Sequence, residues 1–170
     1  MATYYEWTIG CQMNRSESLR LSSRLQEMGH TQVNSADKAD IILLNTCVVR
    51  QNAEDKALNK LANLKALKKK FPQKTIALTG CLVDDPEKIK ERFVFVDIVF
   101  PAGSWPQAWL KTSIPALPSK AEISSSISIM QGCDQFCTYC IVPYRRGREI
   151  SRHPQDIIAE AQTLVKRGAL

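Results

Sequence analysis

The apolar positions of the chain form short runs that alternate with longer segments of helical spacing. The runs are rich in β-branched and aromatic residues and end at Gly, Pro or polar residues, which is typical of strands. The run that begins at Ile41 is continuously apolar, as in strands buried on both faces of a parallel sheet. We predict strands at Tyr4–Ile9, Ile41–Asn45, Thr75–Thr79 and Val94–Phe100.

Helical patterns fill the gaps between these strands. In the first gap, Leu21, Leu25 and Met28 form an apolar stripe at helical spacing. The alternation of strands and helices predicts an α/β fold, with an open parallel sheet of the Rossmann or flavodoxin-like kind over residues 1–111. The predicted helices run from Asn14 or Ser16 to Gly29, from Asn52 to Lys70, and from Pro86 through Ile89.

A second, shorter unit follows. Pro115, Pro118 and three consecutive serines mark residues 112–126 as a linker. After it we predict a strand at residues 127–130, a cysteine-rich loop and a helix from Pro154. One strand and one helix cannot bury an apolar helix face, so residues 127–170 are expected to be the truncated start of a larger domain. The apolar positions of that helix are Ile157, Ile158, Ala161, Leu164 and Val165.

Composition indicates the cellular compartment of the protein, the chemistry of its cysteines and the charge of its partner. The sequence contains no run of about 18 apolar residues, and its N-terminus is unlike a signal peptide, so we expect a cytoplasmic protein without membrane contact. Thiols stay reduced there, so six cysteines favour metal or redox chemistry over disulfides. The net charge is +6, and four arginines against one glutamate between Tyr144 and Arg152 suggest a polyanionic partner.

Three of the cysteines, Cys133, Cys137 and Cys140, have C-x3-C-x2-C spacing on one short loop. Such close thiolates favour an iron–sulfur cluster, and three ligands for four irons would leave one iron open. The alternative is a zinc site. Tetrahedral zinc needs a fourth ligand, for which His153 is the nearest candidate.

The other three cysteines, Cys11, Cys47 and Cys81, are separated by 36 and 34 residues, yet each ends a predicted strand. The carboxyl ends of parallel strands share one edge of a sheet, so we expect these thiols to converge. Each also lies close to a helix N-terminus, which favours the thiolate. Three unrelated core cysteines remain the alternative.

The loop and the residues after it resemble the radical S-adenosylmethionine methylthiotransferases, and among them the MiaB-type enzymes that act on tRNA. The resemblance covers the whole chain but only part of a family member. It rests on the cysteine loop, on Ile141 to Arg152, and on the segments Thr8–Asn14, Asn45–Arg50 and Thr79–Cys81.

The resemblance implies two 4Fe-4S clusters. Cys133, Cys137 and Cys140 would hold the cluster that binds S-adenosyl-L-methionine, at the start of a radical SAM partial TIM barrel. Cys11, Cys47 and Cys81 would hold an auxiliary 4Fe-4S cluster that handles the sulfur to be inserted. Tyr139 would contact the cofactor, with core packing as the alternative. The candidates for RNA phosphate contacts are Arg145, Arg146, Arg148 and Arg152.

The implied activity is that of a tRNA methylthiotransferase like 2-methylthio-N6-(dimethylallyl)adenosine synthase. A methylthio group would be inserted, by way of a 5′-deoxyadenosyl radical, into an N6-modified adenosine near the anticodon. The alternatives are action on N6-threonylcarbamoyladenosine, action on a ribosomal protein side chain, and an iron–sulfur carrier or electron-transfer module. The expected partners are tRNA and an electron donor such as a flavodoxin or ferredoxin, and a monomer is expected. Because later barrel segments would grip cofactor and substrate, the chain is not expected to be active alone.

Overall fold

The computed structural model describes residues 1–106, 109, 117–118 and 121–170. Residues 112–116 and 119–120 of the predicted linker, including Pro115, lie outside the described residues. A five-stranded sheet has the order β2-β1-β3-β4-β5, and every pair in it is parallel, which confirms the predicted open α/β sheet. This is the doubly wound order 2-1-3-4-5. The strands are β1 (Thr3–Thr8), β2 (Thr31–Gln32), β3 (Ile41–Thr46), β4 (Thr75–Gly80) and β5 (Ile98–Val99).

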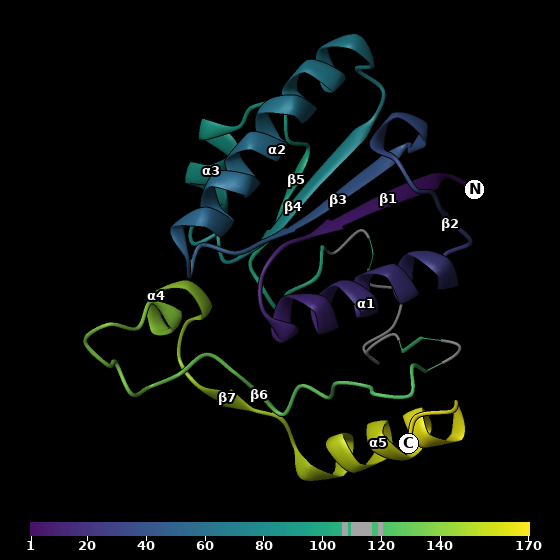
Figure 1. Cartoon of the computed structure of the whole chain (residues 1–170), viewed down its shortest axis with the longest axis vertical. Helices are drawn as coiled ribbons and strands as arrows, with labels where there is room; N and C mark the ends of the chain where they lie inside the picture. The colour runs from purple at the N-terminus through teal and green to yellow at the C-terminus, as the bar shows by residue number, and fades with distance from the viewer. Residues whose placement is uncertain (107–108, 110–116, 119–120) are drawn as a thin grey trace.

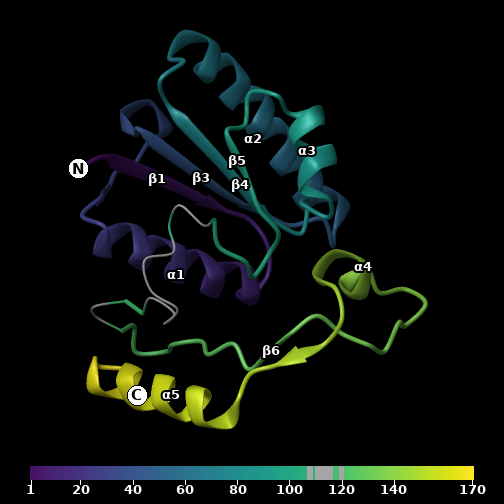
Figure 2. The same cartoon turned by 180° about the vertical axis from the view of Figure 1, so that it is seen from behind.

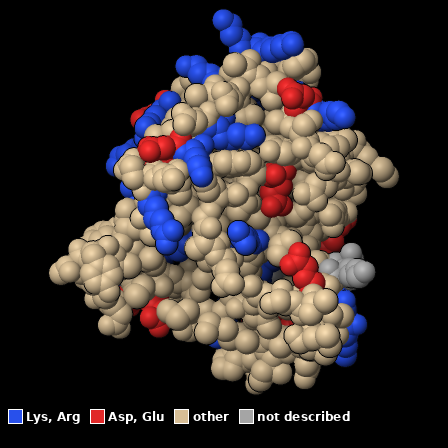
Figure 3. All heavy atoms as spheres, in the orientation of Figure 1, with Lys and Arg blue, Asp and Glu red and all other residues tan. Residues whose placement is uncertain are grey.

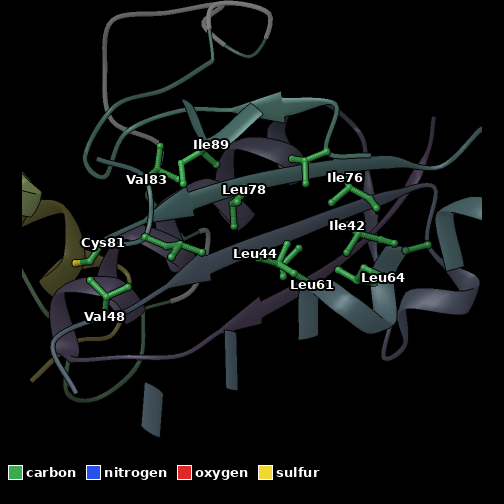
Figure 4. Packing of buried hydrophobic residues seen from close by; sticks show 13 residues of the cluster. Ile42, Leu44, Val48, Leu61, Leu64, Ile76, Leu78, Cys81, Val83 and Ile89 are labelled. Atoms are coloured by element: carbon green, nitrogen blue, oxygen red, sulfur yellow. The ribbon is translucent and has the colours of Figure 1, made fainter. Parts of the chain in front are cut away.

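Helices cover both faces of this sheet (Figure 1). One face carries α1 (Gln12–Glu27), and the other carries α2 (Gln51–Lys70) and α3 (Pro86–Arg92). A short 3-10 helix, η1 (Ala36–Lys38), precedes β3. The alternating sides of β3 explain the two layers. Ile42 and Leu44 pack with residues of α2 and α3, whereas Leu43 packs with residues of α1. Figure 4 shows the larger cluster, in which Leu61 and Leu64 meet the strand residues.

Several elements and boundaries in the sheet domain differ from the predicted ones. The second helix begins at Gln51 with Arg50 as its N-cap, rather than at Asn52. The strand β2 was not predicted, because Thr31 and Gln32 are exposed and polar, with no apolar pattern. The fourth predicted strand is reduced to β5, and Val94 is 81% exposed. The first helix begins at Gln12 rather than at Asn14 or Ser16, so that Cys11 is its N-cap.

The C-terminal unit pairs β6 (Met130–Gln131) with β7 (Ile150–Ser151) in antiparallel fashion. Between them lie the cysteine loop and α4 (Val142–Arg146), and α5 (Pro154–Lys166) follows. Neither α4 nor β7 was predicted. Figures 1 and 2 show α4 beside the end of the sheet where the strands finish, with α5 on the far side of α1 from the sheet. No helix in the described part of the chain is long and apolar enough to cross a membrane.

A buried ion pair links α5 to the sheet domain. Glu160 is 6% exposed and pairs with Arg20 of α1 at 2.5 Å and with Arg152 at 2.6 Å. The apolar positions of α5 are only partly covered, as expected for this unit, since Ile158 and Val165 are 56% and 63% exposed. Leu164 is the exception, because it is 4% exposed and packs with Ala121 and Ala169.

Candidate metal centres at the carboxyl edge of the sheet

The cysteines of the first set lie directly after adjacent parallel strands. Cys11 follows β1 as the N-cap of α1, whereas Cys47 and Cys81 follow the last residues of β3 and β4. Because β3 pairs with both β1 and β4, the three turns share one edge of the sheet. In the 2-1-3-4-5 order the topological switch point lies between β1 and β3, and open α/β sheets bind ligands at that point.

The backbone brings these turns into close contact. Gly10 has a φ of 140°, and a Cβ there would lie 2.8 Å from the Cβ of Cys47. Cys11 and Cys47 line one cleft of about 440 Å³, whose lining also includes Lys56 of α2. The amide of Cys81 donates to the Thr46 carbonyl at 2.8 Å, which brings the third turn beside the second.

A buried amide network fixes two of the turns. Asn14 and Asn45 are both 0% exposed. The Asn14 Oδ1 accepts hydrogen bonds from the Cys11 amide at 3.4 Å and from Cys11 Sγ at 3.2 Å. Its Nδ2 donates to Asn45 Oδ1 at 2.9 Å and to the Thr46 carbonyl at 3.0 Å. Because that carbonyl also accepts from the Cys81 amide, one asparagine links the backbones of all three cysteine turns.

Electrostatics couples Cys81 to its neighbours. Burial raises the pKa of the Cys81 thiol, the charge and hydrogen bonding of the Arg146 guanidinium lower it, and Cys47 and Glu17 raise it further. Metal binding would have to displace the thiol proton, so it would release protons from this edge of the sheet.

The second set of cysteines lies on a loop between β6 and α4 that is closed at its base. The Cys133 amide donates to the Gly147 carbonyl at 3.2 Å. Gly132 has a φ of 73°, and a Cβ there would lie 2.0 Å from the Arg148 carbonyl oxygen. This close approach requires glycine at position 132, so the loop geometry depends on that residue.

Local contacts hold the rest of the loop. The Cys140 amide donates to the Cys137 carbonyl at 3.0 Å, which places these two cysteines on one tight turn. Arg148 pairs with Asp134 at 2.9 Å, and its guanidinium lies 5.8 Å from the centroid of the Phe136 ring. Cys137 is exposed, so the loop presents a thiol to solvent.

The tyrosine next to the last cysteine points away from the core. Tyr139 is 90% exposed, so the alternative of core packing is wrong for this residue. Its contact with a cofactor stays a prediction.

The four arginines after the loop differ in their surroundings. Arg146 has a side chain that is 6% exposed, whereas that of Arg148 is 76% exposed. The sequence offered no signal for the carboxylates that bind Arg145 and Arg146, because these pairs are 61 and 129 residues apart. The ion pairs are Arg145 with Asp84, Arg146 with Glu17, Arg148 with Asp134, and Arg152 with Glu160.

The two donor sets suit a cluster of several irons. In the described residues, which include all six cysteines, no three His, Cys, Asp or Glu side chains are close enough to hold one metal ion. In a four-iron cluster each thiolate binds its own iron, so the sulfurs need not meet at a single ion. The cleft of about 440 Å³ that Cys11 and Cys47 line offers space for such a group beside the first two turns.

These features define a doubly wound α/β protein with two candidate thiolate centres, one on the sheet edge and one on the following loop. The chain belongs to the protein family described as "Uncharacterized protein family UPF0004", which matches residues 3–101.

Relatives match beyond that region. A tRNA-2-methylthio-N(6)-dimethylallyladenosine synthase of Dehalococcoides mccartyi is 50% identical over 99% of this chain and 41% of its own length. Proteins of the same name from Clostridium novyi and a Thermoanaerobacter species are 41% and 38% identical over 95% and 97% of this chain. Their names confirm the resemblance to methylthiotransferases. The chain spans about two fifths of the length of these relatives.

Proposed function

We propose that this chain carries the two cluster-holding parts of a radical S-adenosylmethionine tRNA methylthiotransferase. The observation that supports the proposal is the placement of the cysteine-bearing segments. The turns that carry Cys11, Cys47 and Cys81 share one edge of the sheet, and α4, which directly follows the second set, lies at the same edge. The names of the relatives supply the reaction type and the RNA substrate.

In this proposal Cys11, Cys47 and Cys81 hold an auxiliary 4Fe-4S cluster. The amide network of Asn14 would keep the three sulfurs in place before the metal arrives, so that binding costs little ordering of the chain. Two of the cysteines, Cys47 and Cys81, are 5% and 2% exposed, which would shield the group from bulk water.

Cys133, Cys137 and Cys140 would hold the second cluster, with S-adenosylmethionine bound at its open iron. The exposed ring of Tyr139 is then available to cover the cofactor. The bound groups would supply reductive cleavage of S-adenosylmethionine and delivery of sulfur to a substrate carbon. The chain itself would contribute the thiolates, the closed loop base and the exclusion of water from the sheet edge.

The proposed acceptor is an N6-dimethylallyl adenosine of tRNA near the anticodon. Arg148 is exposed beside the cysteine loop, and Arg145 pairs with Asp84 at the surface, so both are available to phosphate. Figure 3 shows further Lys and Arg side chains gathered over the part of the molecule where α2 lies. The last turn of that helix contains Lys68, Lys69 and Lys70.

The proposal also covers the domain boundaries, the cellular compartment, the oligomeric state and the electron donor. Residues 1–111 would form the methylthiotransferase N-terminal domain, residues 112–126 a linker, and residues 127–170 the start of the radical SAM domain. The protein would work in the cytoplasm as a monomer, with a flavodoxin or ferredoxin as its electron donor.

Anaerobic reconstitution with iron and sulfide tests the proposal. We expect about eight irons per chain, four for each cluster, and a change in the electron paramagnetic resonance (EPR) spectrum when S-adenosylmethionine is added. Saturation of the loop by zinc with no uptake of iron would contradict the proposal. If the chain takes up all of this iron but its EPR spectrum does not change when S-adenosylmethionine is added, an iron–sulfur carrier would be favoured.

A further inference from the structure

The last residue of α4, Arg146, is buried at the contact between the cysteine loop and the sheet domain. Its guanidinium binds both carboxylate oxygens of Glu17 in α1, at 2.6 and 3.3 Å. The two side chains are 6% and 15% exposed. A planar guanidinium that meets a carboxylate in this two-point way is held in orientation as well as in distance.

The ion pair reaches the edge of the sheet that bears the first thiol set. Glu17 belongs to α1, and the N-cap of α1 is Cys11. The buried pair therefore ties the end of α4 to the helix that begins at this edge.

The backbone at Arg146 reaches the second set of thiols. The next residue, Gly147, accepts the hydrogen bond of the Cys133 amide at 3.2 Å and so closes the base of the cysteine loop. Arg146 thus binds the helix that begins after Cys11 through its side chain, and it adjoins the anchor of Cys133 through its backbone.

Arg145 and Arg148, the neighbouring arginines, form ion pairs that are much more exposed than that of Arg146. The side chains of Arg145 and its partner Asp84 are 27% and 47% exposed, and those of Arg148 and Asp134 are 76% and 38% exposed. Exposed pairs of this kind contribute little to orientation, whereas a buried charge that loses its partner is strongly disfavoured.

We propose that Arg146 is a positioning residue that sets the separation and orientation of the two thiol sets, and that it does not contact RNA. The inference rests on the proposed function only in that each thiol set is taken to hold a cluster. Glu17 fixes the guanidinium, and the guanidinium holds α4 against the start of α1 at the sheet edge. The Gly147 carbonyl, one residue further on, anchors Cys133 in turn.

A cross-linking experiment on the metal-free chain tests the positioning directly. In a variant that retains only Cys81 and Cys133, a short bifunctional maleimide measures how often the two thiols come within reach of each other. We expect Arg146→Gln to slow the cross-link roughly tenfold or more, since the loss of one partner of a buried, hydrogen-bonded charge pair shifts an equilibrium by at least that factor. Arg146→Lys keeps the charge without the two-point geometry and should fall between the two.

Arg148→Gln is the matched control, because it changes an exposed arginine of the same segment and should leave the rate unchanged. Circular dichroism confirms that each variant is folded. A cross-linking rate in a folded Arg146→Gln or Arg146→Lys chain equal to that of the parent would overturn the inference.

In the reconstituted chain with all six cysteines, Arg146→Gln should keep its iron while the spin–spin interaction between the two reduced clusters changes in the EPR spectrum. Full iron with an unchanged interaction would also overturn the inference. Failure of the parent chain to take up iron would contradict the proposed function instead, and the cross-linking rate would still decide the role of Arg146.

Discussion

Asn14 and Asn45 hydrogen-bond to each other in both directions. The Asn14 Nδ2 donates to Asn45 Oδ1, and the Asn45 Nδ2 donates to the Asn14 carbonyl, each at 2.9 Å. The second amide also donates to Ser18 Oγ at 3.1 Å. Both side chains are fully buried, so the start of α1 and the end of β3 are joined by polar contacts that cannot exchange with water.

Asn14→Ala should therefore lower both stability and iron uptake at the first thiol set. The substitution leaves the Asn45 amide oxygen without its buried donor, which typically costs about 1–3 kcal/mol. Chemical denaturation measures the loss, and iron analysis measures the uptake. Asn63→Ala is the control, because Asn63 is exposed on α2. Equal behaviour of the two variants would show that the network does not organise the cysteine turns.

Removal of one thiol set should remove one cluster. The triple substitution of Cys133, Cys137 and Cys140 by Ala should leave about half of the iron, because the two sets are on separate parts of the fold and bind independently. The converse triple substitution of Cys11, Cys47 and Cys81 should do the same. A complete loss of iron in both variants would indicate a single shared site.

RNA binding should separate Arg148 from Arg146. Each phosphate contact that is lost lowers the slope of log K against log salt by roughly 0.7 to 0.9. We expect this decrease for Arg148→Gln, whose side chain is exposed, and no decrease for Arg146→Gln, whose side chain faces Glu17. The measurement is binding of an anticodon stem-loop at several salt concentrations. An equal decrease of the salt slope in both variants would show that Arg146 also contacts RNA.

Stability should depend on pH through Glu6 on β1. Burial raises the pKa of Glu6 above its usual value of 4.5, and hydrogen bonds from Thr8 and Ser22 lower it only in part. The folded chain therefore retains this proton to a higher pH than the unfolded chain does. The stabilising effect of the proton is complete below the unfolded pKa and is lost as the pH rises through the folded pKa.

Glu6→Gln should accordingly melt at a higher temperature than the parent chain at about pH 7, with little or no gain at about pH 4. Thermal unfolding at both pH values checks the difference. Glu91→Gln, on the exposed side of α3, provides the control. A gain of the same size at both pH values would argue against burial of the Glu6 charge as its cause.

The cysteine loop should depend on Gly132 more than on Gly147. Both residues have positive φ, 73° and 75°, so alanine at either costs about 1–3 kcal/mol in backbone strain. Only at Gly132 would the added Cβ also meet the Arg148 carbonyl, whereas nothing lies within 4 Å at Gly147. We expect Gly132→Ala to lose iron from the second set and Gly147→Ala to retain it. Equal retention would show that the loop base tolerates opening.

The sequence predicted the elements whose signal is local. The apolar run at Ile41 predicted a strand buried on both faces, and the positions of Cys11, Cys47 and Cys81 after strands predicted their shared edge; the structure agrees on both. The ligand roles of the cysteines remain predictions.

Contacts between distant parts of the chain had no such signal. Ion pairs have no fixed spacing, so the partners of Arg20 and Arg146 could not be found from the sequence. The helix α4 was missed because it has five residues and contains Pro143. The burial of Leu164 in α5 was not expected, because its partner Ala121 is distant in the sequence.

The carboxylate of Glu160 is shared by arginines from both sides of the predicted linker, Arg20 before it and Arg152 after it. Separation of the two units would break the pair between Arg20 and Glu160, whereas Glu160 would keep Arg152. The largely buried Arg20 guanidinium would then lose its partner. The predicted linker thus marks a boundary in composition, while this ion pair joins the described parts of the chain on either side of it.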